Sequence, residues 1–365
     1  MSLKNIYKNK TVLITGHTGF KGSWLTAWLL HLGAKVIGVS NEVPTSPSLF
    51  DSANLNKLIR DERADITDLK SLIKLFNIHK PDFVFHLAAQ ALVRPSYQDP
   101  LLTLYVNAIG TATILEAIRI FNKNIISIII TSDKVYDNKE WVWGYKETDS
   151  FGGKDPYSAS KGMAELAIKT YINSYFQNDE EKIKLAVGRA GNVIGGGDWA
   201  KDRIVPDCIK SWSNDMTVSL RNPNATRPWQ HVLEPLSGYL LLGKKLFENS
   251  INFESYNFGP SAEQNSTVLS LIKEMSKHWK NVKWEENRII NKKVYEAGLL
   301  KLNCDKALHE LNWKPTLNFK ETIKLTIEWY KKFYESDKND MFKHTVKQIE
   351  FFTTKAQERH KSWTI

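Results

Sequence analysis

The stretch that decides the fold is Thr11-Val-Leu-Ile-Thr15, followed directly by Gly16-His-Thr-Gly19-Phe-Lys-Gly22. Its first five residues are apolar or β-branched and predict a buried strand, and a helix-like run follows the last glycine. In such a strand–turn–helix unit, Gly16 permits a tight turn and Gly19 lets the backbone approach a pyrophosphate. Gly22 allows the helix to pack on the strand while the helix N-terminus faces the anion. The stretch therefore predicts a dinucleotide site at the start of the chain.

The same alternation continues over the first 190 residues. The segments predicted as strands are residues 11–15, 35–40, 59–64, 82–87, 125–131 and 183–189. The fourth and fifth of these are nearly continuous apolar runs, which is typical of strands buried on both faces. Strands separated by stretches of helix length form a parallel sheet with crossover helices. We therefore expect an α/β fold with a doubly wound parallel sheet of the Rossmann type.

After about residue 190 glycine and proline become denser and the alternation stops, with further helices expected near 266–280 and 319–335. We expect a dinucleotide-binding domain over residues 1–187, with return segments near 226–258. Residues 188–225 and 259–340 are expected to form a smaller, mixed α/β substrate lobe. The charged residues 341–365 are expected to form a helical appendage.

The composition argues against several classes of protein. The chain has 365 residues and a net charge of +10, but only ten of its 50 basic residues are arginines. Scattered lysines without an arginine-rich block indicate a solvated surface, and we expect no nucleic-acid partner. The two cysteines, Cys208 and Cys304, have no C-x-x-C spacing, so neither a disulfide framework nor a metal site is expected.

The N-terminal region carries no hydrophobic signal segment, because the first predicted strand begins by residue 11. No apolar run in the sequence approaches the roughly 18 residues that a membrane-spanning helix needs. We therefore expect a cytoplasmic protein without a membrane partner.

A second motif, Tyr157-x-x-x-Lys161, lies downstream of the fifth predicted strand. Asp155 and Pro156 are typical of a helix N-cap and first-turn proline, which places Tyr157 in the first turn and Lys161 one turn later on the same face. An ammonium group near a phenol favours the phenolate and lowers its pKa from about 10. The motif therefore predicts a base for a sugar hydroxyl.

The end of the second predicted strand bears on the choice of dinucleotide. Val36-Ile-Gly-Val-Ser40-Asn41 ends in neutral polar residues, where an acidic residue usually binds the adenosine ribose. Glu42 is the nearest acid. No arginine lies in this segment to bind a 2′-phosphate, so NAD is favoured over NADP.

Several motifs together carry a resemblance to a known family. The glycine motif, Asp65-Ile66, His86-Leu-Ala-Ala89-Gln90, Tyr105-Val-Asn107 and the Tyr157/Lys161 pair resemble the extended short-chain dehydrogenase/reductase family. Within it, Thr131-Ser-Asp-Lys-Val-Tyr136, residues 188–199 and residues 221–231 resemble the sugar-nucleotide 4,6-dehydratases, in particular those that act on CDP-glucose. The resemblance runs from about residue 8 to 335.

The resemblance implies a role for particular residues. The catalytic set that it implies is Ser132, Asp133, Lys134, Tyr157 and Lys161. The set implied to bind NAD is Gly16, Thr18, Gly19, Phe20, Gly22, Ser40, Asp65, Ile66, Leu87, Ala88, Ala89, Gln90, Asn107, Tyr157 and Lys161. The set implied to bind the nucleotide diphosphate is Asn192, Arg221 and Arg227.

The adjacent Asp133 and Lys134 fit dehydration chemistry. Oxidation at C4 of a hexose makes the C5 proton acidic, so that a base removes it while an acid protonates the departing C6 oxygen. The thymidine-nucleotide dehydratases carry Asp-Glu at these two positions, whereas this chain has Asp-Lys. Lys134 is either the base at C5, which requires its pKa to fall from about 10.4, or a protonated group that stabilises the enolate. The sequence leaves both roles open.

Three classes of function stay open at this point. The leading one is a lyase that dehydrates CDP-glucose or another NDP-hexose and feeds deoxysugar synthesis for surface polysaccharide. The second is an NAD-dependent sugar-nucleotide 4-epimerase or reductase with the same Tyr157/Lys161 pair, and the third is a non-catalytic protein that keeps a dinucleotide fold. The resemblance also implies a homodimer formed through helices of the first domain.

Overall fold

The computed structural model describes residues 1–179, 181–261, 263–286, 299–335 and 341–364. Its centre is a seven-stranded sheet in the order β11-β6-β5-β4-β1-β2-β3, in which every neighbouring pair is parallel. The strands are β1 (Thr11–Thr15), β2 (Lys35–Ser40), β3 (Arg60–Arg63), β4 (Phe83–His86), β5 (Ile125–Ile130), β6 (Ile183–Ala190) and β11 (Glu254–Phe258). The six predicted strands and the doubly wound α/β fold are confirmed.

Helices cover both faces of this sheet. One hydrophobic cluster joins it to α1 (Leu3–Tyr7), α2 (Phe20–His31) and α10 (Leu233–Phe247), and a second joins it to α4 (Leu69–His79), α7 (Gly110–Phe121) and α8 (Pro156–Ser174). Along β1, Val12 and Ile14 belong to the first cluster and Leu13 to the second. This division follows from the alternation of side chains along a strand, and it explains why the strands read as continuous apolar runs.

Short elements complete the first part of the chain: α3 (Leu49–Ser52), η1 (Leu55–Lys57), α5 (Val93–Gln98), α6 (Pro100–Leu104), η2 (Tyr105–Ile109), η3 (Asp133–Val135) and η4 (Phe176–Asp179). Helices α6, η2 and α7 run on into one another over Pro100–Phe121. This helix is long and apolar enough to cross a membrane by length and composition, which corrects the expectation that no segment approaches that length. It packs against α4 and α8, and 56% of its apolar window is buried inside the protein.

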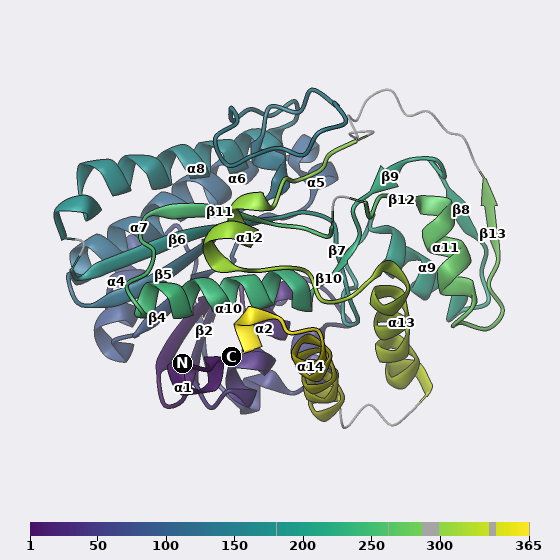
Figure 1. Ribbon diagram of the computed structural model, residues 1–365, viewed down its shortest axis with the longest axis horizontal. Coiled ribbons are helices and arrows are strands. Elements are labelled where there is room, and N and C mark those ends of the chain that lie inside the picture. The colour runs from purple at the N-terminus through teal and green to yellow at the C-terminus, as the bar shows by residue number, and fades with distance from the viewer. Residues whose placement is uncertain (180, 262, 287–298, 336–340, 365) are drawn as a thin grey trace.

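The remaining elements form a smaller group beside the sheet, on the right in Figure 1. Its strand pairs are β7 (Val193–Ile194) with β10 (Gln230–His231), β8 (Val218–Leu220) with β13 (Trp284–Glu286), and β9 (Thr226–Arg227) with β12 (Ser266–Thr267). Its helices include α9 (Ile204–Trp212), α11 (Val268–Ser276) and α13 (Phe319–Glu335), while α12 (Asp305–Leu311) packs on β11. Residues 287–298 and 336–340, which were assigned to the substrate lobe, lie outside the described residues.

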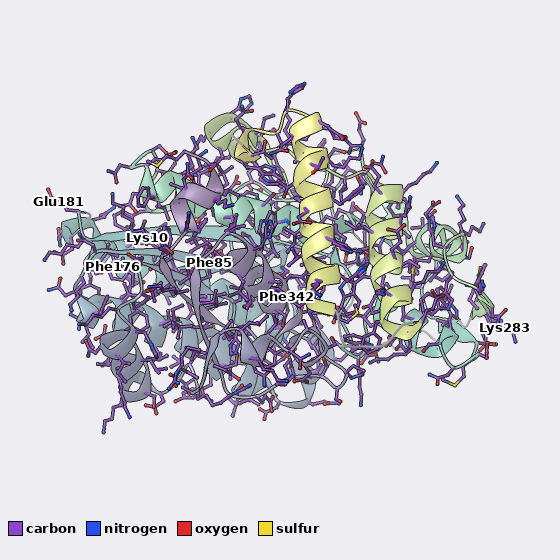
Figure 2. All side chains as sticks on the ribbon, turned by 90° about the horizontal axis from the view of Figure 1, so that it is seen from below. Lys10, Phe85, Phe176, Glu181, Lys283 and Phe342 are labelled. Atoms are coloured by element: carbon purple, nitrogen blue, oxygen red, sulfur yellow. The ribbon has the colours of Figure 1, made fainter. Side chains whose placement is uncertain are left out.

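The C-terminal helix α14 (Met341–Glu358) and the turn η6 (Ser362–Thr364) pack into the main hydrophobic cluster. Figure 2 shows α14 lying alongside α13 when the molecule is seen from below. The rings of Phe352 and Trp363 lie 5.9 and 5.8 Å from the ring of Trp28 on α2. The segment expected to be an appendage is therefore built into the core against α2.

Candidate active site

The carboxyl ends of the parallel strands open into one continuous cleft with a volume of about 1310 Å³. Ligands of doubly wound sheets bind at this edge. The cleft brings together every residue that the sequence assigned to a site except Asn107. Asn107 is buried behind it, where its side chain exchanges hydrogen bonds with the backbone of Gln90 and donates one to Ser160 Oγ (2.8 Å). Asn107 therefore supports the cleft wall from outside.

The glycine turn has the geometry that a dinucleotide requires. Gly16 has φ = +76°, and a Cβ there would lie 2.7 Å from the backbone nitrogen of Ala88. A Cβ on Gly22 would lie 2.0 Å from the carbonyl oxygen of Gly16. Helix α2 begins after Gly19 without a side-chain cap, so its first N–H groups face the cleft uncapped. These residues fit the pyrophosphate of NAD.

At the end of β2 the structure differs from the sequence reading. Ser40 Oγ lies 3.1 Å from His17 Nδ1, and His17 Nε2 lies 2.9 Å from Asp61 Oδ1 on β3. Burial lowers the pKa of His17, and the Asp61 carboxylate opposes that shift. Arg63 of the neighbouring strand pairs in register with Ser40 and binds Asp61 Oδ2 at 2.8 Å, so an arginine that the sequence of the second strand does not contain lies beside it in space. An acid and an arginine of the neighbouring strand thus lie close to Ser40, although neither lines the cleft.

The turn that the sequence predicts to be catalytic, Ser132-Asp133-Lys134, lies at the end of β5. Ser132 caps the turn η3, and its Oγ donates a hydrogen bond to Asp133 Oδ1 (2.9 Å). Asp133 is buried, and its Oδ2 lies 3.8 Å from Lys134 Nζ. Gly191, at the end of the neighbouring strand β6, packs against this carboxylate, since a Cβ there would lie 2.2 Å from Asp133 Oδ2. Only glycine at 191 leaves room for Asp133 in this position.

Helix α8 presents Tyr157 and Lys161 to the same cleft. Asp155 is its N-cap, accepting a hydrogen bond from the backbone nitrogen of Ser158 (3.0 Å), and Pro156 is its first residue, as predicted. Burial raises the pKa of Tyr157 to about 12, and Asp133 and Asp155 also raise it, while the hydrogen bond with Ser132 and the charge of Arg203 lower it. Burial also lowers the pKa of Lys161 to about 8, against the field of Glu165. The expectation of a lowered phenol pKa is therefore wrong for this structure, because desolvation outweighs the nearby charges.

A buried cluster connects the Ser132-Asp133-Lys134 turn to this helix. Arg189 on β6 binds both carboxylate oxygens of Glu165 on α8 (2.7 and 2.9 Å). Thr131 donates to the same carboxylate (2.6 Å), and Arg189 donates to the hydroxyl of Tyr136 (2.8 Å). Thr131 and Tyr136 flank the Ser132-Asp133-Lys134 turn, so one ion pair fixes both ends of that turn relative to α8.

The far side of the cleft carries the residues assigned to the diphosphate. Asn192 has a left-handed backbone (φ = +27°), and its buried Nδ2 has no hydrogen-bond partner among the described residues. Arg221 lies 3.2 Å from Asp202. Arg227 donates to the carbonyl of Thr226 (2.8 Å).

Sequence reasoning missed several charged residues of the cleft. Lys21, Arg94, Asp202 and Arg203 all line it. Arg203 binds Asp198 (2.8 Å) and acts on the charge of Tyr157, while Arg94 lies 3.5 Å from Asp202. Lys21 belongs to the glycine motif itself, so the sequence could have indicated it. Arg94, Asp202 and Arg203 lie outside the motifs, and no spacing pattern marks them. Over residues 1–179, 181–261, 263–286, 299–335 and 341–364, no group of three or more His, Cys, Asp or Glu side chains could hold a metal ion.

A parallel sheet with a glycine turn at β1 and a Tyr-x-x-x-Lys helix after β5 defines an extended short-chain dehydrogenase/reductase that uses NAD. The model of one of its families, GDP-mannose 4,6 dehydratase, matches residues 13–326. The chain belongs to this family, whose members dehydrate nucleotide sugars.

Comparison with individual proteins gives a consistent result. The chain is 45% identical over 336 residues to the CDP-glucose 4,6-dehydratase of Salmonella typhimurium, covering 90% of this chain and 92% of that protein. It is 23% identical to the dTDP-glucose 4,6-dehydratase of Shigella flexneri, over 87% of this chain and 92% of that one.

Solved structures show the same fold. The dTDP-glucose 4,6-dehydratase of Bacillus anthracis in complex with NAD gives a TM-score of 0.72 at 19% identity, over 89% of this chain and 98% of that one. A UDP-glucose 4-epimerase of Stenotrophomonas maltophila with bound NAD gives a TM-score of 0.76 at 20% identity, over 90% of this chain and 100% of that one.

Proposed function

We propose that this protein converts CDP-D-glucose to CDP-4-keto-6-deoxy-D-glucose. The observation that carries the proposal is the Asp133–Lys134 pair, which lies beside Ser132 in the cleft that also holds Tyr157 and Lys161. A 4-epimerase needs only the groups that move a hydride and a proton at C4. The loss of water across C5 and C6 needs a second acid and base, and this pair supplies them.

Bound NAD supplies a hydride acceptor for C4 and later a hydride donor for C6. The residues that hold it in this proposal are the glycine turn, Ser40, Asp65 and Ile66, and residues 87–90. Tyr157 takes the proton of the C4 hydroxyl, and Ser132 orients that hydroxyl. Burial favours the neutral Tyr157 phenol without ligand, and the positive charge of Arg203 opposes this effect and favours the phenolate.

The elimination step falls to Asp133 and Lys134. Their Oδ2 and Nζ atoms lie 3.8 Å apart. Loss of water needs a base that takes the proton from C5 and an acid that gives a proton to the departing C6 oxygen, and this pair supplies both where Lys134 is the base. Both assignments of Lys134, as base and as cation beside the enolate, are consistent with this geometry.

The diphosphate of the nucleotide sugar is assigned to the far side of the cleft. Arg227, Arg221 and the buried Nδ2 of Asn192, which has no hydrogen-bond partner among the described residues, support this assignment. In this proposal the diphosphate competes with Asp202 for Arg221. Arg203 joins the set, because its guanidinium lies in the cleft within the field of Tyr157.

The test is incubation of the protein and NAD with CDP-glucose, dTDP-glucose, UDP-glucose and GDP-mannose in turn. We expect a product lighter by one water, with a keto group, from CDP-glucose. A C4 epimer without mass loss would identify the second candidate, a sugar-nucleotide 4-epimerase. If the protein converts none of these nucleotide sugars, both candidate functions, dehydratase and epimerase, would be contradicted.

We further propose that two copies pair through the helix Pro100–Phe121 and α8, which contact each other. Six large apolar side chains on these helices are at least 44% exposed: Leu101, Leu102, Tyr105, Ile109, Met163 and Leu166. An exposed apolar patch of this kind is typical of a subunit interface. Sedimentation should give a dimer, and a double variant with Leu101 and Leu166 changed to Glu should sediment as a monomer. We place the reaction in the cytoplasm and its product in deoxysugar synthesis for surface polysaccharide.

A further inference from the structure

Gln230 is a buried amide that does not line the cleft. It lies on β10 and is 2% exposed. Its Nε2 donates hydrogen bonds to the carbonyls of Gly191 (3.2 Å) and Phe258 (3.0 Å), at the ends of β6 and β11. Because both partners are carbonyl oxygens, they determine which end of the amide is the nitrogen. The other end, Oε1, is buried and has no hydrogen-bond partner among the described residues.

A small cavity adjoins the cleft beside this amide. The space in it that is open to the centre of a water molecule is about 10 Å³, which is enough for one water. Asp133 and Gly191 line both the cleft and the cavity, whereas Gln230 lines the cavity and not the cleft. Asp133 therefore lies between the cleft and the space that Gln230 borders. Buried polar atoms in folded proteins nearly always have a partner, which is either protein or an ordered water.

The carboxylate of Asp133 has room for a further donor. Its Oδ1 accepts a hydrogen bond from Ser132 Oγ (2.9 Å). Its Oδ2 lies 3.8 Å from Lys134 Nζ, which is too long for a hydrogen bond. An ionised carboxylate accepts hydrogen bonds at both oxygens. A water that donates one hydrogen to Gln230 Oε1 has its second hydrogen free for this carboxylate.

We propose that one water molecule in this cavity joins Gln230 Oε1 to the Asp133 carboxylate, and that Gln230 is thereby a positioning residue for the elimination across C5 and C6. The role in elimination rests on the proposed function, whereas the water site does not. In this inference Asp133 is the acid that protonates the departing C6 oxygen.

The expected effect is confined to one step of the reaction. When Asp133 gives up its proton, a carboxylate charge appears, and a hydrogen bond from the water stabilises it. Oxidation at C4 leaves the charge of Asp133 unchanged, and the nucleotide is not bound by this group. Loss of the water should therefore slow elimination, without slowing C4 oxidation or weakening substrate binding.

The test combines a crystal structure with single-turnover kinetics. In wild type we expect a water within about 3.2 Å of both Gln230 Oε1 and one Asp133 carboxylate oxygen. In Gln230→Met the water should be lost and kcat with NAD and CDP-glucose should fall about tenfold to hundredfold, as for one hydrogen bond to a charged group. KM should change little, and NADH absorbance should build up on the enzyme.

The matched control is Gln264→Met. Gln264 Nε2 also donates to a backbone carbonyl, that of Trp229 (2.8 Å), but Gln264 lines neither the cavity nor the cleft. This variant should keep the wild-type kcat and show no added NADH.

A second variant removes the water and keeps Gln230. A methyl group on Gly259, which lines the cavity, would lie 3.4 Å from Cys304 Sγ and 3.7 Å from Leu302 Cβ, which are ordinary contacts. Gly259→Ala should take the space of the water and accumulate NADH as Gln230→Met does. It replaces Gln230→Met should that variant fail to fold by circular dichroism.

Three outcomes would overturn the inference. One is a wild-type structure without a water between Gln230 and Asp133. Another is a Gln230→Met enzyme that slows C4 oxidation and elimination equally, because Gln230 would then act only on the fold. The third is a Gly259→Ala enzyme that has lost the water but eliminates at the wild-type rate. A wild-type protein that holds this water but dehydrates no nucleotide sugar would instead contradict the proposed function and leave the water site standing.

Discussion

Asp133 and Lys134 form an ion pair between neighbouring residues, with Oδ2 and Nζ 3.8 Å apart at the end of β5. Asp133 is buried and accepts a hydrogen bond from Ser132, whereas Lys134 is 28% exposed. The two side chains thus differ in their access to solvent. This difference allows their roles to be separated by single substitutions.

Asp133→Asn should separate oxidation from elimination. We expect the variant to oxidise C4 but to lose water slowly, because the amide neither accepts the C5 proton nor protonates the C6 oxygen. NADH absorbance should then build up on the enzyme during a single turnover in a stopped-flow instrument. A flat trace in the variant beside a transient in wild type would move Asp133 to the hydride-transfer step.

Tyr157→Phe should lower kcat by roughly 10² to 10⁴, the usual contribution of a general acid or base. The Kd for CDP should change little, since the hydroxyl is assigned to the hexose and not to the nucleotide. Steady-state kinetics and nucleotide titration measure the two quantities. A variant with more than half of wild-type turnover would remove Tyr157 from the proposed mechanism.

Arg227→Ala should act mainly on binding. Loss of one charge-assisted hydrogen bond to the diphosphate is expected to weaken CDP binding by about 1.5–3 kcal/mol. Titration with CDP measures this, and Lys210→Ala, on the cleft wall but bonded to the carbonyl of Trp199, is the comparison. Equal affinity in Arg227→Ala and wild type would make Arg227 a structural residue of β9.

Glu165→Ala should destabilise the fold, because it leaves the buried guanidinium of Arg189 without its counter-ion. Breaking such a pair costs about 3–5 kcal/mol in the free energy of unfolding. The matched control is Glu358→Ala, which removes an exposed pair with Lys355 and should cost about 0–1 kcal/mol. Urea denaturation should distinguish the two, and similar losses in both variants would argue against the proposed clamp.

Acid should destabilise the protein through two buried histidines. Burial lowers the pKa of His86 and of His231 to about 3. Because the folded pKa lies below the unfolded value of about 6.5, the unfolded chain binds more protons as the pH falls below 6.5. The free energy of unfolding should then decrease by about 1.4 kcal/mol per pH unit for each histidine. Urea titrations at pH 7 and pH 5 test this, and equal stabilities would contradict it.

The sequence predicts local features well, because they depend on neighbouring residues. The glycine turn after β1, the N-cap at Asp155 and the six strands follow from short-range patterns of this kind. Arg63 beside Ser40 was missed because it depends on the register between β2 and β3. The raised pKa of Tyr157 was missed because burial is set by packing from several elements.

The C-terminal helix shows the same limit. Its sequence is rich in charge and reads as a solvated segment. Met341, Ile349, Phe352 and Ala356 nevertheless recur at helical spacing and are buried against α2 and α13. This stripe becomes a core face only because α2 presents Trp28 opposite it.

In the proposed function, one cleft oxidises C4, removes water across C5 and C6, and returns the same hydride to C6. The most direct measurement uses CDP-glucose with deuterium at C4 and follows the label by NMR and mass spectrometry. We expect deuterium at C6 of a product lighter by one water, no net release of NADH, and solvent hydrogen at C5. Deuterium that stays at C4 without loss of water, or that appears in free NADH, would contradict the account.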